Sequence, residues 1–149
     1  MSDRPISWEE RIRRAAPYVL SLVRIVVGLL FFEHGLSKLF GFPAGEVREL
    51  FTLSWYSGVI EFMTGALLTA GLGTRAAAFV ASGEMAFAYF LSHAPASFFP
   101  LINRGDAAIL YCFIFFYLAF AGGGPCSLDH WLKGRVFENG RLPSGTRRA

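Results

Sequence analysis

The stretch APYVLSLVRIVVGLLFFEHGLSKLF, residues 16–40, decides how the rest of the chain is interpreted. It is long enough to cross a bilayer, because a membrane-spanning helix needs roughly 20 mostly apolar residues. It also contains Arg24, and an arginine at the centre of a bilayer costs about 3 kcal/mol or more. Such a side chain has to face protein or water and find a partner there. The stretch therefore predicts a membrane helix that packs inside a bundle of helices.

One face of this predicted helix combines glycines, an aromatic residue and two basic residues. At 3.6 residues per turn, a single stripe holds Arg24, Gly28, Phe31, Gly35 and Lys38. Two later apolar segments each contain one acid, Glu61 and Glu84. We therefore expect Arg24 to form an ion pair with one of these two carboxylates inside the bundle.

The composition of the whole chain favours a membrane protein of one domain. Hydrophobic residues make up 54% of the 149 residues and charged residues only 17%, with a mean hydropathy of +0.44. A soluble protein this short needs more charge to cover its large relative surface. The net charge of +3 does not indicate nucleic-acid binding, because the basic residues lie mostly in the two tails. Cys112 and Cys126 have no disulfide or metal-binding spacing.

The order of apolar segments predicts an all-α fold, an integral membrane four-helix bundle with a short C-terminal interfacial helix. After the first span, further spans are expected at 55–71, 76–92 and 106–120, and the interfacial helix at 127–134. Pro17 is expected in the first turn of the first span. The predicted domains are a cytoplasmic segment 1–14, a membrane domain 15–132 and a disordered cytoplasmic tail 133–149.

The distribution of basic residues predicts the orientation of these four spans. Four spans put both termini on one side of the membrane. That side would carry ten basic residues: Arg4, Arg11, Arg13, Arg14, Arg75, Lys133, Arg135, Arg141, Arg147 and Arg148. The other side would carry three: Lys38, Arg48 and Arg104. The excess predicts a bacterial-type plasma (inner) membrane protein with cytoplasmic N- and C-termini.

The ionisable residues within the spans are the candidate functional residues. Ionisable groups inside membranes are costly and are associated with function. We predict that Arg24, Glu61 and Glu84 line a cavity as catalytic residues. Towards the outer end of the bundle, His34, Lys38 and Asp106 are predicted to bind a ligand or cofactor. No metal site is predicted. The alternative is that the charged residues only fix the register of the helices, and that glycines and alanines let the helices close up without a cavity.

Several motifs in this order resemble the DoxX family of small four-helix membrane proteins, from Leu22 to Leu132. The matching residues are Arg24, Gly28, Gly35 and Lys38; then Gly58, Glu61, Gly65, Gly71, Thr74 and Arg75; then Gly105 and Asp106; and finally the segment from Gly122 to Asp129. The chain differs in having Asp106 where Glu is more usual, and Cys126 where an aromatic residue is common.

The resemblance implies a redox association, because relatives resemble the membrane subunits of thiosulfate:quinone oxidoreductases. The leading hypothesis is a quinone-reactive subunit of an oxidoreductase assembly, with quinone as the cofactor. The sequence has no flavin, haem or iron–sulfur motif, so electrons would come from a soluble redox partner protein. The alternatives are a small proton-coupled transporter, which would act as a homo-oligomer, and a non-catalytic membrane anchor or assembly factor.

Overall fold

The structure is a computed structural model that describes residues 6–43, 45 and 47–139, with side chains up to residue 134. The described residues form helices joined by turns and loops, and they contain no strand. The helices are α1 Trp8–Phe40, α2 Leu53–Ala70, α3 Thr74–Ala88, the π-helix η1 Tyr89–His93, α4 Pro100–Asn103, α5 Asp106–Ala121 and α6 Leu128–Asn139. The expected all-α fold is therefore confirmed for the described residues.

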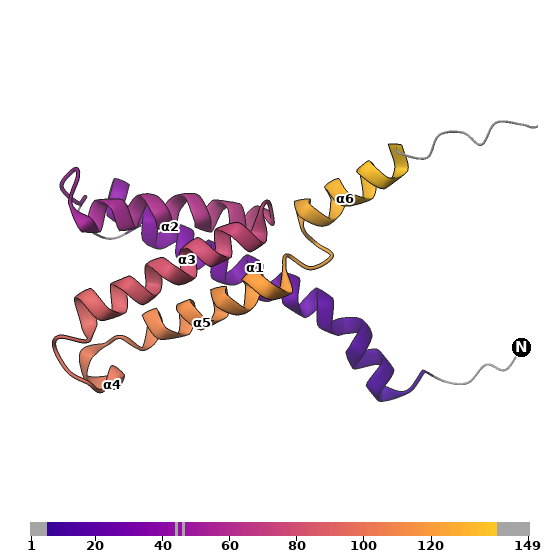
Figure 1. Ribbon diagram of the computed structural model, residues 1–149, viewed down its shortest axis with the longest axis horizontal. Coiled ribbons are helices and arrows are strands. Elements are labelled where there is room, and N and C mark those ends of the chain that lie inside the picture. Colours follow the sequence, from indigo (N-terminus) through magenta and orange to yellow (C-terminus); the bar gives the residue numbers. More distant parts are fainter. Residues whose placement is uncertain (1–5, 44, 46, 140–149) are drawn as a thin grey trace, which may run out of the picture.

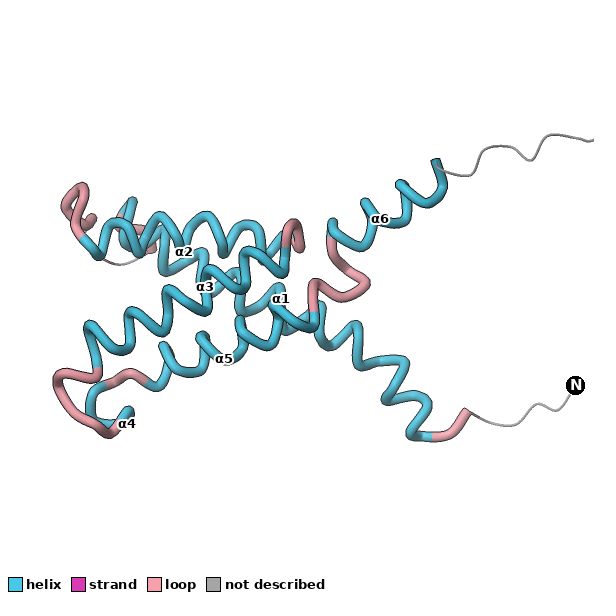
Figure 2. The backbone as a smooth tube through the Cα atoms, viewed as in Figure 1, coloured by secondary structure: helices cyan, strands magenta, loops and turns pink. Residues whose placement is uncertain are grey.

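Four of these helices run alongside one another in alternating directions (Figure 1). α1 packs against α2, α3 against α5, and α2 against α3. The start of α1 and the whole of α6 lie at one end of this bundle, beyond the other helices. The connections from α1 to α2 and from η1 to α5 lie at the opposite end (Figure 2). The described chain therefore enters and leaves the bundle at the same end.

Helix α1 is longer than the sequence predicts. It begins at Trp8, where the Ser7 hydroxyl accepts a hydrogen bond from the Glu10 N–H, 3.3 Å. Pro17 lies inside the helix and not in its first turn, so that prediction is wrong. The boundary predicted after residue 14 is also not a structural boundary, because helix runs through it. The predicted tail 133–149 begins within α6, and its part at 140–149 lies outside the described residues.

Glycines bring α1 and α2 into close contact. A methyl group added to Gly35 would lie 2.7 Å from the Cα of Phe62, and one added to Gly65 would lie 2.7 Å from the Cα of Phe32. The two phenylalanine rings then pack on each other with centroids 4.7 Å apart. Because backbone and not a flexible side chain fills this space, the two glycines set the distance between the helices.

A layer of buried apolar side chains crosses the middle of the bundle. Phe31 from α1 meets Phe115 from α5 edge to face, with ring centroids 4.7 Å apart. Leu68 and Leu118 are as completely buried as Phe115. We call these four residues the central apolar layer. Tyr111 stacks on Phe115 beside this layer, with ring centroids 5.6 Å apart.

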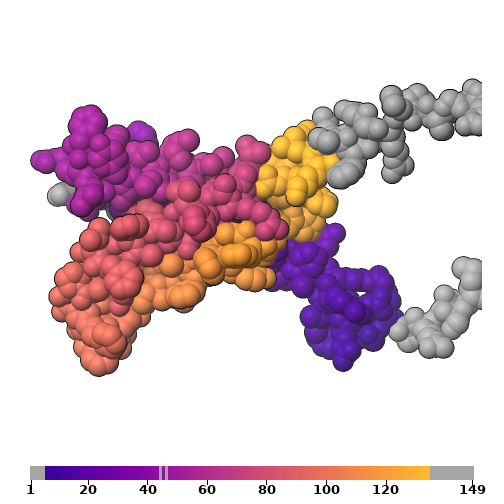
Figure 3. All heavy atoms as spheres, viewed as in Figure 1, coloured from indigo at the N-terminus to yellow at the C-terminus, as the bar shows by residue number. Residues whose placement is uncertain are grey.

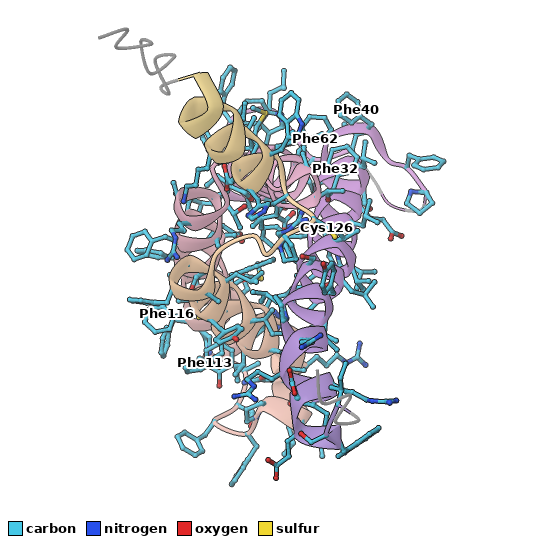
Figure 4. The ribbon with its side chains drawn as sticks, turned by 90° about the vertical axis from the view of Figure 1, so that its right-hand side faces the viewer. Phe32, Phe40, Phe62, Phe113, Phe116 and Cys126 are labelled. Atoms are coloured by element: carbon cyan, nitrogen blue, oxygen red, sulfur yellow. The ribbon has the colours of Figure 1, made fainter. Side chains whose placement is uncertain are left out.

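The outer surface of the bundle is apolar. Phe113 and Phe116 point away from the bundle (Figure 4) and are 68% and 47% exposed. Phe79 and Phe87 on α3 are also exposed. Burying such side chains gains about 1.5–3 kcal/mol each, which a lipid environment would provide. By length and hydropathy one described helix, α1, can cross a membrane, while α5 is apolar but has only 16 residues. Four membrane crossings therefore stay a prediction.

Helix α6 is joined to the start of α3 by Asp129. Ser127 accepts a hydrogen bond from the His130 N–H, 3.2 Å, and so caps α6. The Asp129 carboxylate instead accepts hydrogen bonds from the N–H groups of Gly73 and Thr74, each 2.8 Å. Burial would raise the pKa of Asp129, but the hydrogen bonds from Thr74 and Gly73, together with nearby Lys133, lower it below its usual value. The expected short helix after the fourth span is confirmed, and Asp129 fixes where it leaves the bundle.

Candidate functional site

Arg24 is completely buried and is held by backbone carbonyl groups. Its Nε donates to the Gly123 carbonyl, 2.9 Å, and its Nη2 to the Cys126 carbonyl, 2.5 Å. Its Nη1 donates to the carbonyls of Leu68 and Thr69, the latter at 2.8 Å. The guanidinium therefore joins the end of α2 to the loop between α5 and α6. Carbonyls at the C-terminus of a helix have no partner within the helix, and a cation there is favourable.

The predicted ion pair between Arg24 and Glu61 or Glu84 is wrong. No carboxylate of the described chain lies within ion-pair distance of Arg24. The reason is geometric: the guanidinium group of Arg24 lies beside the last turn of α2 and the glycine loop, and these carbonyls are closer to it than either acid. The glycines allow this, because Gly123 and its neighbours bring main-chain carbonyls next to the guanidinium. Arg24 therefore does not form one polar group with the two acids, and a cavity lined by all three stays a prediction.

The two glutamates belong to a different polar group, which includes Lys38 of α1. Lys38 lies about 21 Å beyond Arg24 along α1, at 1.5 Å per residue. Lys38 donates a hydrogen bond from Nζ to Glu61 Oε1, 2.8 Å, and another to Ser57 Oγ, 2.7 Å. Ser57 in turn donates to Glu84 Oε1, 2.7 Å. We call Lys38, Ser57, Glu61 and Glu84 the polar chain. It connects three helices, α1, α2 and α3, through charged and hydroxyl groups.

Two carboxylate oxygens of the polar chain have no partner. Oε2 of Glu61 and Oε2 of Glu84 are buried and make no hydrogen bond within the described residues. Glu61 itself is only 1% exposed. A buried polar atom without a hydrogen bond usually costs 1–3 kcal/mol, so these two atoms need a function or a further partner. Lys38 keeps 25% of its side chain exposed, which links the buried end of the chain to the surface.

The charges of the polar chain do not cancel. One lysine faces two carboxylates, so the fully ionised chain has one negative charge in excess. Binding of a single proton removes this excess and leaves a neutral group inside the bundle. In a medium of low dielectric constant, that neutral state is favoured over an unbalanced charge. The arrangement is therefore suited to taking up and giving back one proton.

The remaining predicted site residues lie in different places. His34 is exposed one turn before Lys38; its Nδ1 lies 2.8 Å from the Leu30 carbonyl, and its ring packs edge-on to Tyr111. Asp106 begins α5, is exposed, and contacts neither Lys38 nor the glutamates in the part of the chain described. Of the predicted group His34, Lys38 and Asp106, only His34 and Lys38 lie near each other, one turn apart on α1.

Ser57 is the functional candidate that the sequence analysis missed. It lies four residues before Glu61 and one before Gly58, so a helical wheel places it on the buried face of α2. That signal is weak, because serine on a membrane helix commonly bonds to its own backbone. Only the positions of Lys38 and Glu84 show that its hydroxyl connects them.

Two hollows in the surface lie away from the polar chain. One of 490 Å³ is lined by residues 12–23 of α1 together with Tyr117. The other, of 740 Å³, lies where α6 leaves the bundle. Neither has Glu61 or Glu84 in its lining. Among the described residues, no group of three or more His, Cys, Asp and Glu side chains is placed to hold a metal ion.

The comparison with known families matches the part of the chain that contains both polar groups. The family model for DoxX matches residues 19–94, which include Arg24 and the whole polar chain. The chain belongs to the DoxX family. A DoxX protein is a membrane protein, in keeping with the apolar outer surface described above. A protein of Haemophilus influenzae (strain ATCC 51907 / DSM 11121 / KW20 / Rd), named as uncharacterized, is 41% identical over 128 residues, 80% of this chain and 94% of that relative. No solved structure matches the chain.

The DoxX match begins at residue 19, within α1, continues through η1 and stops at residue 94. It therefore contains the glycine contacts between α1 and α2, Arg24, and all four members of the polar chain. The loop that supplies two of the four carbonyls around Arg24 lies beyond it. Membership of the family thus accounts for the first three helices, and the H. influenzae relative extends the similarity over most of the chain.

Proposed function

We propose that this DoxX protein is a four-span inner-membrane subunit of an oxidoreductase assembly, and that its polar chain supplies protons to a quinone. The observation that carries the proposal is the pair of buried, unpartnered carboxylate oxygens on Glu61 and Glu84, joined through Lys38 and Ser57. A quinone oxygen is an acceptor that a protonated carboxyl group can satisfy. The protein's family resemblance supports the redox association.

The proposed reaction balances as follows. A quinone takes up two electrons and two protons and becomes a quinol. The electrons come from a flavin- or haem-bearing partner protein; the polar chain provides a proton to one quinone oxygen, and water at the membrane surface provides the proton for the other. Exposed His34, one turn from Lys38, provides the route by which the chain is reprotonated from water. Ser57 connects Lys38 to Glu84, because its hydroxyl accepts a hydrogen bond from Lys38 and donates one to Glu84. Lys38 also donates to Glu61.

The carboxylates can be tested by reducing bound quinone and recording the infrared difference spectrum. The purified protein is reconstituted with a short-chain ubiquinone and dithionite as the electron source. We expect a carboxyl C=O signal on reduction in the wild type, its loss in Glu61→Gln combined with Glu84→Gln, and a reduced signal in Ser57→Ala. Glu33→Gln is the matched control, because Glu33 is an exposed glutamate of α1 outside the polar chain. It should behave like the wild type.

A folded double variant that keeps both quinone binding and the carboxyl signal would refute the proton-donor role. Folding is checked separately by the melting temperature in detergent. Substitution by glutamine keeps shape and hydrogen bonding while removing the ionisable proton. Loss of signal therefore cannot be attributed to a changed side-chain volume.

The orientation has its own test. With Cys112 and Cys126 replaced by alanine, single cysteines are introduced at Ser2 and Ser97. Four crossings with cytoplasmic termini place Ser2 inside and Ser97, in the loop after η1, outside. An impermeant thiol reagent applied to intact cells should label the Ser97→Cys protein and leave the Ser2→Cys protein unlabelled until the cells are opened. Labelling of both on the same side would mean an even number of crossings between them and would refute this topology.

A further inference from the structure

The 740 Å³ hollow lies at the end of the bundle where α6 turns away from α1. In the space-filling view an open notch separates α6 from the start of α1 (Figure 3). Its walls come from four segments: Pro17 and Tyr18 of α1, the start of α3, the glycine loop 122–124, and α6. It thus has both apolar and polar walls beside helix ends, at the end of the protein that holds both described chain ends.

Two basic side chains line this hollow, and both have free donors. Arg75 donates from Nη1 to the carbonyls of Ala119 and Phe120, the former at 3.1 Å. Its Nε and Nη2 make no hydrogen bond to any described residue and lie against Gly122 in the wall of the hollow. Lys133, from the second turn of α6, is exposed and lines the same space.

The acid in this hollow, Asp129, already accepts hydrogen bonds from the protein. Both Asp129 oxygens accept hydrogen bonds from the first N–H groups of α3. Its charge is therefore directed at a helix N-terminus, where it is stabilising. Asp129 balances one of the two basic residues, so Arg75 and Lys133 leave one positive charge in excess in the lining.

A second positive charge lies directly behind the wall. Arg24 is bonded to the carbonyls of Gly123 and Cys126, and Gly123 lines the hollow. No carboxylate of the described chain forms an ion pair with Arg24, although the charge of Asp129 acts on it from a greater distance. A buried charge that is satisfied by hydrogen bonds but lacks a counterion keeps its field, which is weakly screened in an apolar medium. This field adds to that of Arg75 and Lys133 on the open side of the wall.

We propose that this hollow binds the phosphate of an anionic phospholipid headgroup. The phosphate would accept hydrogen bonds from the free nitrogens of Arg75 and from Lys133. Leu128 and Trp131 of α6 are 42% and 51% exposed beside it, and they would rest on the membrane surface. A lipid is favoured over free phosphate because the hollow joins apolar side chains such as Tyr18 and Leu20 to the basic ones. Basic pockets between membrane helices on the cytoplasmic side commonly bind such headgroups.

The proposal rests on the proposed orientation, in which this end faces the cytoplasm, but not on quinone chemistry. The test uses full-length protein in nanodiscs of phosphatidylcholine containing a small fraction of phosphatidylglycerol. Native mass spectrometry after gentle detergent release counts the phosphatidylglycerol retained per protein. We expect the combined variant Arg75→Gln and Lys133→Gln to bind phosphatidylglycerol about tenfold or more weakly, since each basic residue near an anionic surface contributes on the order of 1 kcal/mol.

The control removes equal charge from the same end. Arg11→Gln with Arg13→Gln lowers the net charge by the same two units on α1, outside the hollow. It should retain the lipid as the wild type does. An equal loss in both double variants would mean unspecific surface attraction, and no loss in either would mean that the hollow binds no headgroup; each result overturns the proposal. Displacement by millimolar inorganic phosphate without lipid dependence would assign the site to a free anion.

The two proposals fail separately. If lipid retention depends on Arg75 and Lys133 but the infrared spectrum is unchanged in the glutamate variants, the lipid site is supported and the quinone role is refuted. The reverse pattern would remove the lipid site alone. A variant that unfolds is recognised by its melting temperature and replaced by Arg75→Lys, which keeps the charge and should keep part of the binding.

Discussion

Replacement of Arg24 by leucine is expected to abolish accumulation of the folded protein. The side chain donates hydrogen bonds to four buried or partly buried carbonyls, two at the end of α2 and two in the loop after α5. Of these four, only the Leu68 carbonyl also accepts from a backbone N–H among the described residues. Each carbonyl left without a partner costs about 1–3 kcal/mol, and a whole domain is stable by only 5–15 kcal/mol. Arg24→Lys should be intermediate, because an ammonium group cannot reach four acceptors with the planar fork of a guanidinium. Size-exclusion profiles in mild detergent and melting temperatures measure the loss.

The same experiment separates this arrangement from an ion pair. If Arg24 neutralised Glu61, removal of both charges would be less harmful than removal of Arg24 alone. The carbonyl contacts predict no such rescue: the destabilisation by Arg24→Leu and by Glu61→Gln should add. Recovery of folding in the combined variant would contradict the structure. Arg13→Leu is the control, since Arg13 is an exposed arginine of the same helix and its loss should be tolerated.

Gly35→Ala is expected to separate α1 from α2. The added methyl group would meet the backbone of Phe62, which cannot move without the whole of α2. Overpacking of this kind usually costs about 1–3 kcal/mol, and Gly65→Ala, which meets the backbone of Phe32 in the same way, should add to it. The melting temperature should fall in each single variant and further in the double one.

Gly83→Ala is the matched control for the glycine variants. Gly83 is an exposed glycine of α3, and a methyl group placed there meets nothing within 4 Å. Alanine is favoured over glycine inside a helix by about 1 kcal/mol, so this variant should be neutral or slightly more stable. Destabilisation of the control as large as that of Gly35→Ala would show that these helices respond to backbone propensity and not to the contact.

The sequence predicted the helices well because apolar length and glycine spacing are local properties. Gly71 ends α2 and Gly41 ends α1, both in left-handed conformations that glycine accepts readily. The start of α1 was missed because the polar segment before Pro17 lacks hydrophobic periodicity. This segment is helical because Ser7, ten residues before the proline, caps the N-terminus of α1.

The partners of the charged residues were harder to predict. Charge complementarity suggested that Arg24 should meet an acid, yet main-chain carbonyls solved the same problem of hydrogen bonding at a helix end. Backbone acceptors leave no mark in a sequence, because every residue carries one. Lys38 lies near the C-terminus of α1, and its contact with Glu61 depends on how far Gly58 lets α2 approach the Lys38 side chain.

The central apolar layer has a consequence for the energetics of the membrane. Phe31 lies on α1 between Arg24 and Lys38, packs against Phe115, and is 1% exposed. Protons move along hydrogen-bonded groups, and these side chains offer none. If the chain crosses the membrane as proposed, a proton that enters the polar chain at Lys38 would return to the compartment from which it came. Chemistry at the polar chain would then leave the transmembrane voltage intact, so the protein could exchange protons in an energised membrane without acting as a leak.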